Sequence, residues 1–296
     1  GVQTCALPIS SSTSISLRIW NQMNYGQDLV FGPRGGGIYY WSASVATPLS
    51  VRGVALNSLG GTVTMTIASP CVVTASIVLT EGAAVSFSTT GALPTGITAG
   101  TTYYAYQVDG LTFKLLTAAG AVVNTSGTQS GTHSMTLVDV PTVQNVLTIS
   151  DTSRFVFAMG CNDYASATLD PMLIRWSNQN DVYNWTPDAT NQAGSVRLSH
   201  GSEIISAIQT RQEIVVLTDS SVYSLQYLGP PYVWGSQLLG DNISIAGPNA
   251  VAQANNVVYW MGVDKFYMYD GRVQTLNCDL RRYVFGDIDQ IGRAHV

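Results

Sequence analysis

The sequence predicts an all-β fold, built as a partial propeller-like body that is interrupted by a small β-sandwich or barrel-like module. Three hairpins carry this prediction, at residues 29–41, 214–225 and 257–269. Each consists of an apolar strand, a short polar or glycine-containing turn and an aromatic-rich strand, which is the pattern of paired β-strands. Helical periodicity is weak throughout. The second and third hairpins begin roughly 40 residues apart, a spacing typical of propeller blades or stacked sheets.

The first part of the body is expected at residues 10–69 and contains the first hairpin. Its turn holds Gly35, Gly36 and Gly37 between two apolar strands. A glycine-rich loop that cradles phosphate needs a helix N-terminus directly after it, and no helical pattern follows here. These glycines are therefore expected to permit positive φ in a hairpin turn.

The inserted module is expected at residues 70–137, where the composition changes. This stretch is dense in Thr, Gly, Ala and Ser, and its charged residues are Glu81, Asp109 and Lys114. Short alternating runs separated by Pro and Gly turns predict a small independent β module. The remainder of the body is expected at residues 138–290. It holds a fourth strand pair, at residues 155–159 and 172–176, followed by the second and third hairpins.

The two ends of the chain, residues 1–9 and 291–296, resemble the two strands of a translated sequencing adapter. We expect both to be adapter artefacts and exclude them from fold reasoning. On this view the chain is an internal fragment of a longer reading frame assembled from environmental or bulk sequence. The apolar residues that follow Cys5 are then no signal peptide.

Composition indicates a surface with few charges. Charged residues make up 10% of the chain, against roughly 25% in an average soluble domain. Such surfaces suit β-rich, tightly assembled structural proteins and surfaces that are buried in an oligomer. The net charge of -5 and the lack of a basic stripe argue against wrapping of duplex nucleic acid. Passing contact with DNA inside the lumen of an assembly stays open, because such walls are often neutral or acidic.

Two observations bound the cellular setting. No apolar run approaches the ~20 residues that a membrane helix needs, so no membrane span is predicted. Cys71, Cys161 and Cys278 are widely spaced and form no Cys-x-x-Cys pair. An odd and sparse set of this kind predicts reduced, buried thiols and synthesis in a reducing cytoplasm.

The strongest polar–aromatic cluster in the sequence is Arg175, Trp176, Asp181 and Trp185. A catalytic role would need an acid–base partner, and none has suitable spacing. We expect Arg175 to pair with Asp181 while both Trp rings cap strand ends, since Arg–aromatic stacking is common in β folds. A hot-spot role at an interface is the alternative, because Trp, Tyr and Arg dominate interface energetics.

Other chemistry is poorly supported. His133 and His200 lack Cys or carboxylate partners at metal-ligand spacing, no Gly-x-Ser-x-Gly motif is present, and the acidic turns do not match calcium-loop spacing. We therefore predict no catalytic, cofactor-binding or metal-binding residues, and no enzyme activity. The candidate interaction residues are Trp20, Tyr25, Arg175, Trp176, Asp181, Trp185, Tyr232, Trp234 and Trp260.

Seven segments of the body carry a resemblance to a known family, at residues 20–29, 173–181, 184–187, 228–232, 247–251, 259–262 and 267–273. They resemble segments of the tail hub or nozzle proteins of tailed bacteriophages and occur in the order expected for that family. The parts of the chain over which they are spread amount to about 190 residues. The resemblance implies a propeller-like β domain in a virion protein.

A second resemblance concerns the inserted module. Residues 92–104 and 127–133 are similar to a small β module found in phage tail and virion proteins. Residues 80–84 depart from the usual opening of that module. The resemblance implies a module that decorates surfaces and binds cells or glycans.

These resemblances imply a structural component of a phage tail, acting as hub, nozzle or adaptor without catalysis. Its expected partners are other tail subunits, in a homo-oligomeric ring that is assembled in the host bacterial cytoplasm and located in the virion. The alternative is a glycan-binding or depolymerising receptor-binding protein, whose exposed Trp and Tyr side chains stack on host-surface sugars. A depolymerising enzyme would need two carboxylates about 5 to 9.5 Å apart across a cleft.

Overall fold

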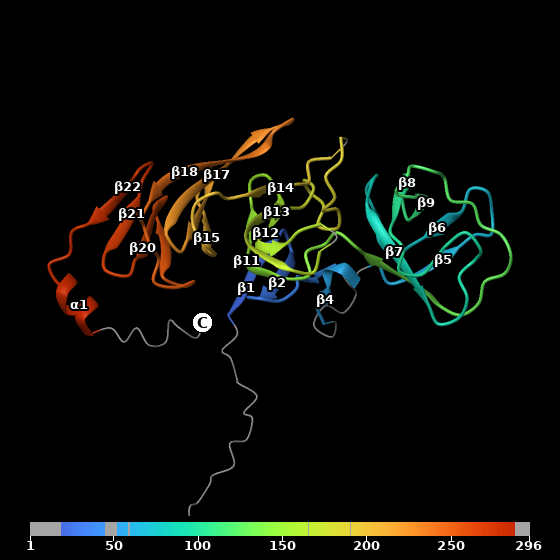
Figure 1. Cartoon of the computed structure of the whole chain (residues 1–296), viewed down its shortest axis with the longest axis horizontal. Helices are drawn as coiled ribbons and strands as arrows, with labels where there is room; N and C mark the ends of the chain where they lie inside the picture. Colours follow the sequence, from blue (N-terminus) through green and yellow to red (C-terminus); the bar gives the residue numbers. More distant parts are fainter. Residues whose placement is uncertain (1–18, 45–51, 59, 165, 190, 288–296) are drawn as a thin grey trace, which may run out of the picture.

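The computed structural model describes residues 19–44, 52–58, 60–164, 166–189 and 191–287 (Figure 1). The terminal segments at residues 1–9 and 291–296 lie outside the described residues. The chain is 49% strand and 4% helix, which confirms the predicted all-β class. The helical content includes the one-turn segment η2 (Leu56–Ser58) and the short helix α1 (Arg281–Asp287).

Within the described residues, the body consists of four antiparallel sheets of four strands each. In every sheet the strands follow in chain order, so each sheet is a meander. The first sheet holds β1 (Trp20–Tyr25), β2 (Asp28–Pro33), β3 (Tyr39–Trp41) and β4 (Val54–Ala55). The second holds β11 (Gln144–Ser150), β12 (Phe155–Asn162), β13 (Leu169–Trp176) and β14 (Gly194–Arg197). The third holds β15 (Ile204–Gln209), β16 (Glu213–Thr218), β17 (Ser221–Gly229) and β18 (Val233–Asp241). The fourth holds β19 (Val251–Ala254), β20 (Val257–Met261), β21 (Phe266–Tyr269) and β22 (Val273–Leu276).

All four expected strand pairs are present. The three hairpins form the pairs β2–β3, β16–β17 and β20–β21, and the fourth pair is β12–β13. Each pair is antiparallel and joined by a short turn or a local loop, so its register is fixed by residues close in sequence.

The sheets of the body stack face to face, which explains why β16 is apolar at successive positions. Ile214 and Val216 pack into a cluster shared with the second sheet. Val215 and Leu217 point to the other face and pack into a cluster shared with the fourth sheet. Because successive side chains of a strand point to opposite faces, a strand between two sheets must be apolar on both.

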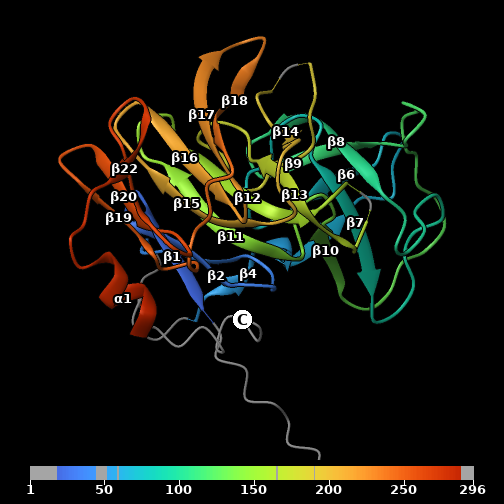
Figure 2. The ribbon, with the colours of Figure 1, turned by 60° about the vertical axis from the view of Figure 1, so that its left-hand side comes forward.

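The first strands of successive sheets lie side by side. β1 contacts β11, β11 contacts β15, and β15 contacts β19, and Figure 2 shows β1, β11 and β15 as neighbours. Arg34, in the first hairpin turn, reinforces this arrangement across three sheets. Its guanidinium lies 2.6 Å from Glu203 Oε1 and donates to the carbonyls of Ile205 (3.0 Å) and Asn145 (3.3 Å). The arrangement is compatible with a propeller-like body.

A six-stranded closed barrel interrupts the body and lies at one end of the molecule (Figure 1). Its strands are β5 (Thr62–Met65), β6 (Val72–Thr74), β7 (Ala84–Thr89), β8 (Tyr103–Asp109), β9 (Thr112–Leu116) and β10 (His133–Leu137). The expected module began at residue 70, whereas the barrel also contains β5. Closure through the β5–β10 pair leaves the small sheet without a free edge.

The barrel is joined to the body by apolar packing and by hydrogen bonds. One buried cluster contains barrel residues such as Phe87 together with Val30 of the first sheet and Val156 of the second. Thr80 Oγ1 lies 3.0 Å from Asp181 Oδ2 and 2.6 Å from Asn184 Nδ2. These contacts hold the barrel against the loop that follows β13.

Two further sequence predictions concern cysteines and membranes. Cys71 and Cys161 are buried free thiols, as predicted, but Cys278 is half-exposed. Burial raises the pKa of the Cys161 thiol to about 12. Among the described residues, no helix has the length and apolar character needed to cross a membrane.

Candidate interaction surfaces

The predicted pairing of Arg175 with Asp181 is wrong. Arg175 lies on β13 and is 1% exposed. Its Nη1 donates to the Asn162 carbonyl at 3.1 Å, and its Nη2 donates to the Asp139 carbonyl. Its guanidinium also covers the Tyr164 ring. Carbonyl acceptors beside the buried β-strand pair both Nη atoms, whereas Nε has no acceptor among the described residues. Arg175 is therefore an interior residue and does not form a surface site.

Asp181 instead links the body to the barrel. Its carboxylate accepts hydrogen bonds from the Thr80 hydroxyl at 3.0 Å and from the Tyr183 backbone N–H at 2.8 Å. Burial raises the pKa of this carboxyl, and these hydrogen bonds act in the opposite direction. The carboxylate thus orders the loop that seats the barrel.

The two Trp residues of the predicted cluster are internal. Trp176 is the last residue of β13; its Nε1 donates to the Gln192 carbonyl at 2.8 Å, and its ring packs on Phe157. Trp185 is 1% exposed and donates from Nε1 to the Val182 carbonyl at 2.9 Å. Both indole N–H groups are satisfied within the chain, and burial leaves neither ring on an exposed surface.

The first sheet carries an aromatic row, defined here as the exposed Trp20 and the half-buried Phe31 and Tyr39. Trp20 is 53% exposed, and its ring centre lies 6.2 Å from that of Phe31. Phe31 stacks on Tyr39 with ring centres 5.6 Å apart. Tyr25, in contrast, is buried beneath Arg154, whose guanidinium lies 4.9 Å from the ring centre. The structure thus separates the predicted residues Trp20 and Tyr25.

The β17–β18 hairpin projects beyond the third sheet and is called the arm (Figure 2). Trp234 pairs with Tyr227 directly beside the tip and anchors the arm on β12 of the second sheet. Its ring centre lies 4.9 Å from that of Phe157, 5.6 Å from that of Phe155 and 5.4 Å from that of Tyr227. The tip, residues 228–232, is exposed, with Leu228 at 59% and Tyr232 at 77%. The arm therefore presents an apolar tip next to a buried anchor.

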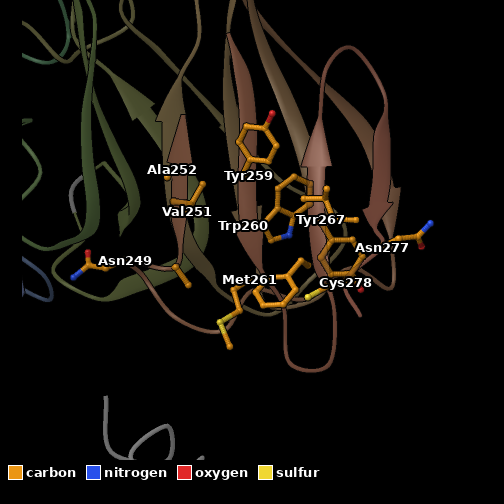
Figure 3. Close-up of a pocket in the computed structure, with 12 residues that line it drawn as sticks. Asn249, Val251, Ala252, Tyr259, Trp260, Met261, Tyr267, Asn277 and Cys278 are labelled. Atoms are coloured by element: carbon orange, nitrogen blue, oxygen red, sulfur yellow. The ribbon is translucent and has the colours of Figure 1, made fainter. Parts of the chain in front are cut away.

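The fourth sheet contains an apolar pocket of about 420 Å³ (Figure 3). None of its lining residues is charged. Trp260 lines it and stacks on Tyr267, with ring centres 5.4 Å apart and an interplanar angle of 18°. Trp260 Nε1 is buried without an acceptor among the described residues. Of the predicted interaction residues, Trp260 lines this pocket.

Sequence reasoning missed several residues of these surfaces. Phe31 and Tyr39 belong to the first hairpin, while Tyr259, Tyr267 and Cys278 line the pocket. The signal that could have found them is the alternation of aromatic residues along the hairpin strands, which places every second ring on one face. In the sequence, this alternation predicts strand pairing and does not by itself distinguish an exposed face from a buried one.

The histidines have local partners. His133 is buried and lies 2.8 Å from Thr89 Oγ1 and 3.1 Å from Gln129 Oε1. His200 Nδ1 lies 2.9 Å from the hydroxyl of the adjacent Ser199. Within the described part of the chain, no group of three or more His, Cys, Asp or Glu residues is placed to hold a metal ion.

The comparison with known proteins finds no match, either among protein-family models or among curated protein sequences. The residues and geometry of the chain are therefore the basis on which its function is inferred.

Proposed function

We propose that the chain is a structural component of a bacteriophage tail, of the hub, nozzle or adaptor kind, that works through subunit–subunit contacts without catalysis. The observation that carries this proposal is a rigid all-β body with apolar, aromatic surfaces on its first and fourth sheets. The resemblance of several segments to phage tail proteins supplies the biological setting.

The physical character of these surfaces suits assembly. Interface cores are enriched in aromatic residues and depleted in charged ones. The aromatic row and the pocket have this composition, in a chain with 10% charged residues. Head-to-tail contacts between identical subunits generate a ring when the rotation closes. We therefore propose a homo-oligomeric ring in the virion, assembled with other tail subunits in the bacterial cytoplasm.

The barrel and the ring interior would have separate roles. The barrel lies at the end of the molecule opposite the fourth sheet (Figure 1), so it would project toward neighbouring subunits or host-surface glycans.

A ring of these subunits would enclose a lumen with few charges, which suits passing contact with DNA because weak electrostatic attraction does not hold the phosphate backbone.

The test is recovery of the full reading frame and its neighbouring genes from longer reads of the same source. We expect portal, terminase or tail genes beside it. Neighbours that encode sugar metabolism or secretion, without virion genes, would contradict the tail assignment.

A second candidate function is glycan binding, and the aromatic row of Trp20, Phe31 and Tyr39 favours it. Sugars stack on exposed aromatic faces, and Trp20, at 53%, is the exposed ring of this row, beside the half-buried Phe31. A glycan array probed with the full chain tests this candidate. Binding that is lost in Trp20→Ala and kept in Tyr232→Ala would support it, whereas an array without signal would remove it.

A further inference from the structure

We propose that the pocket of the fourth sheet receives the arm tip, residues 228–232, of a second copy of this chain. This inference rests on the proposed assembly function and identifies the two surfaces that join one subunit to the next. The observations behind it are the exposure of the tip, the chemistry of the pocket and the positions of both on the molecule.

The arm tip, which we also call the knob, is an exposed apolar turn with a fixed conformation. Leu228, Pro230, Pro231 and Tyr232 carry no charge, and Leu228 and Tyr232 are 59% and 77% exposed. Val233 follows with φ of +56°, an unfavourable backbone state for a β-branched residue that surrounding structure must impose. A knob held in one conformation loses little entropy on docking, which favours affinity.

The pocket has the complementary chemistry. Its lining is uncharged and includes the aromatic residues Tyr259, Trp260, Phe266 and Tyr267. Proline-containing segments dock on aromatic-lined grooves because the ring faces match and the segment is already ordered. A volume of about 420 Å³ lies within the ordinary range for binding pockets. The pocket therefore fits an apolar Pro-Pro-Tyr turn better than a charged ligand.

The positions of knob and pocket require two copies. The pocket lies at the end of the fourth sheet that holds the β20–β21 turn. Ser244 connects this end to the β16–β17 turn: its hydroxyl accepts from Val263 N at 3.1 Å, and the neighbouring Ile243 N donates to the Ser220 carbonyl at 2.9 Å. The arm tip joins β17 to β18 and so lies at the other end of the third sheet. A subunit thus cannot fill its own pocket.

The resulting contact is heterologous, because the tip of one copy meets a different surface on the next. Contacts of this kind repeat and form a closed ring or an open filament, according to the rotation between subunits. In a ring, every copy uses both its tip and its pocket. In a filament, every copy except the two at the ends does so.

The test is sedimentation velocity of the full chain over a range of concentrations, with one variant on each surface. Tyr232→Asp puts a charge on the tip, and Ala252→Glu puts a charge on an exposed position that lines the pocket. We expect the wild type to oligomerise and each variant to weaken association by at least about 30-fold. Val78→Asp is the matched control, because Val78 is an exposed apolar residue of the barrel, at 56%, outside both the tip and the pocket; its association should be weakened far less than that of either variant.

Mixing the two variants gives the sharpest result. The Tyr232→Asp chain keeps its pocket and the Ala252→Glu chain keeps its tip, so an equimolar mixture should form one-to-one dimers and stop there. An oligomer that survives both substitutions, or a mixture that stays monomeric while the wild type assembles, would overturn the docking and leave the assembly function standing. A wild type that is monomeric at every concentration would contradict the docking as well, while the gene neighbourhood tests the tail assignment separately.

Alkylation of Cys278 is an independent readout, since this half-exposed thiol lines the pocket. N-ethylmaleimide should label Cys278 more slowly in the wild-type oligomer than in Tyr232→Asp at the same concentration, as followed by peptide mass spectrometry. Equal rates would show that the pocket is occupied by something other than the arm tip, or by nothing.

Discussion

The guanidinium carbon of Arg175 lies 3.8 Å from the centre of the Tyr164 ring, in the interior beside the second sheet. Two backbone carbonyls, of Asn162 and Asp139, accept hydrogen bonds from the same guanidinium. Both Nη atoms are thus paired and the Tyr164 ring covers the planar group, while Nε has no acceptor among the described residues. Arg175 is thus a fixed element of the core.

Replacing the buried Arg175 cation should strongly lower the free energy of unfolding. Arg175→Met removes both charge-assisted hydrogen bonds and leaves two carbonyls unpaired, so we expect a loss of about 3 kcal/mol in the free energy of unfolding. The control is Arg197→Met, because Arg197 and Asp170 form an exposed ion pair at 2.7 Å, which contributes at most about 1 kcal/mol. Urea denaturation followed by Trp fluorescence measures both; equal losses would contradict the structural role of Arg175.

The Asp181 carboxyl should give stability an unusual pH dependence. Burial raises its pKa above the ordinary value of 3.8, so the folded chain keeps this proton to higher pH than the unfolded chain does. The stability that the protonated Asp181 carboxyl contributes is fully present below the ordinary pKa of 3.8. It is lost as pH rises through the raised pKa of the folded chain. Relative to Asp181→Asn, the wild type should therefore become less stable as pH increases above about 3.8. Denaturation midpoints of both chains across this window measure the difference, and a difference that does not change with pH would refute it.

Asp170 is the matched control with the opposite sign. Burial acts to raise the pKa of this carboxyl, but the hydrogen bonds from Arg197 and from the Met172 backbone, together with the Arg197 charge, outweigh it and lower the pKa. The wild type should therefore lose stability relative to Asp170→Asn as pH falls below the ordinary carboxyl value of 3.8.

The buried anchor Trp234 and the exposed tip of the arm should differ sharply in their effect on stability. Trp234 is 7% exposed in a cluster with Phe155 and Phe157, so Trp234→Ala should cost about 3 to 5 kcal/mol. Tyr232 lies two residues away and is 77% exposed, so Tyr232→Ala should stay within about 0.5 kcal/mol. Thermal unfolding measured at a low protein concentration avoids any contribution from association. A large loss for Tyr232→Ala would mean that the tip is part of the fold and not a free knob.

Gly96 should be essential to the barrel. Its φ is +108°, and a Cβ there would lie 2.1 Å from the backbone oxygen of Asn124. Backbone atoms cannot move aside as a side chain can, so Gly96→Ala should cost about 3 kcal/mol or more. Gly120 has φ of +76° with open space around it, and Gly120→Ala should cost only about 1 to 2 kcal/mol. Urea denaturation measures the free energy of unfolding of both variants. Similar losses would show that the close approach of Asn124 to Gly96 does not affect stability.

The strand pairs were predictable from the sequence because their partners are local. In the third hairpin, Trp260 and Tyr267 face each other across a short turn, and alternation fixes which rings share a face. The continuous apolar run of β16 likewise indicated burial, although periodicity alone does not say that two different sheets cover its faces.

The predicted functional cluster failed where its partners are distant in sequence. Arg175 and Asp181 lie six positions apart, yet their side chains bind different groups. The Arg175 acceptor Asp139 is 36 positions away, and the Asp181 donor Thr80 is 101 positions away. Proximity in sequence gave the wrong pair because a strand and the loop after it pack against different neighbours. The start of the barrel at β5 was missed for a similar reason, since Thr62 and Val63 find their β10 partners only when the barrel closes.

The sequence by itself determined the all-β class, the four local strand pairs and a surface with few charges, because these depend on residue type, alternation and short turns. The tertiary structure alone decided the stacking of the sheets, the closure of the barrel, the burial of Arg175 and Trp185, and the separation of an exposed arm tip from an apolar pocket. Those features depend on which faces meet in space, and the free energy of that choice comes from packing between segments far apart along the chain.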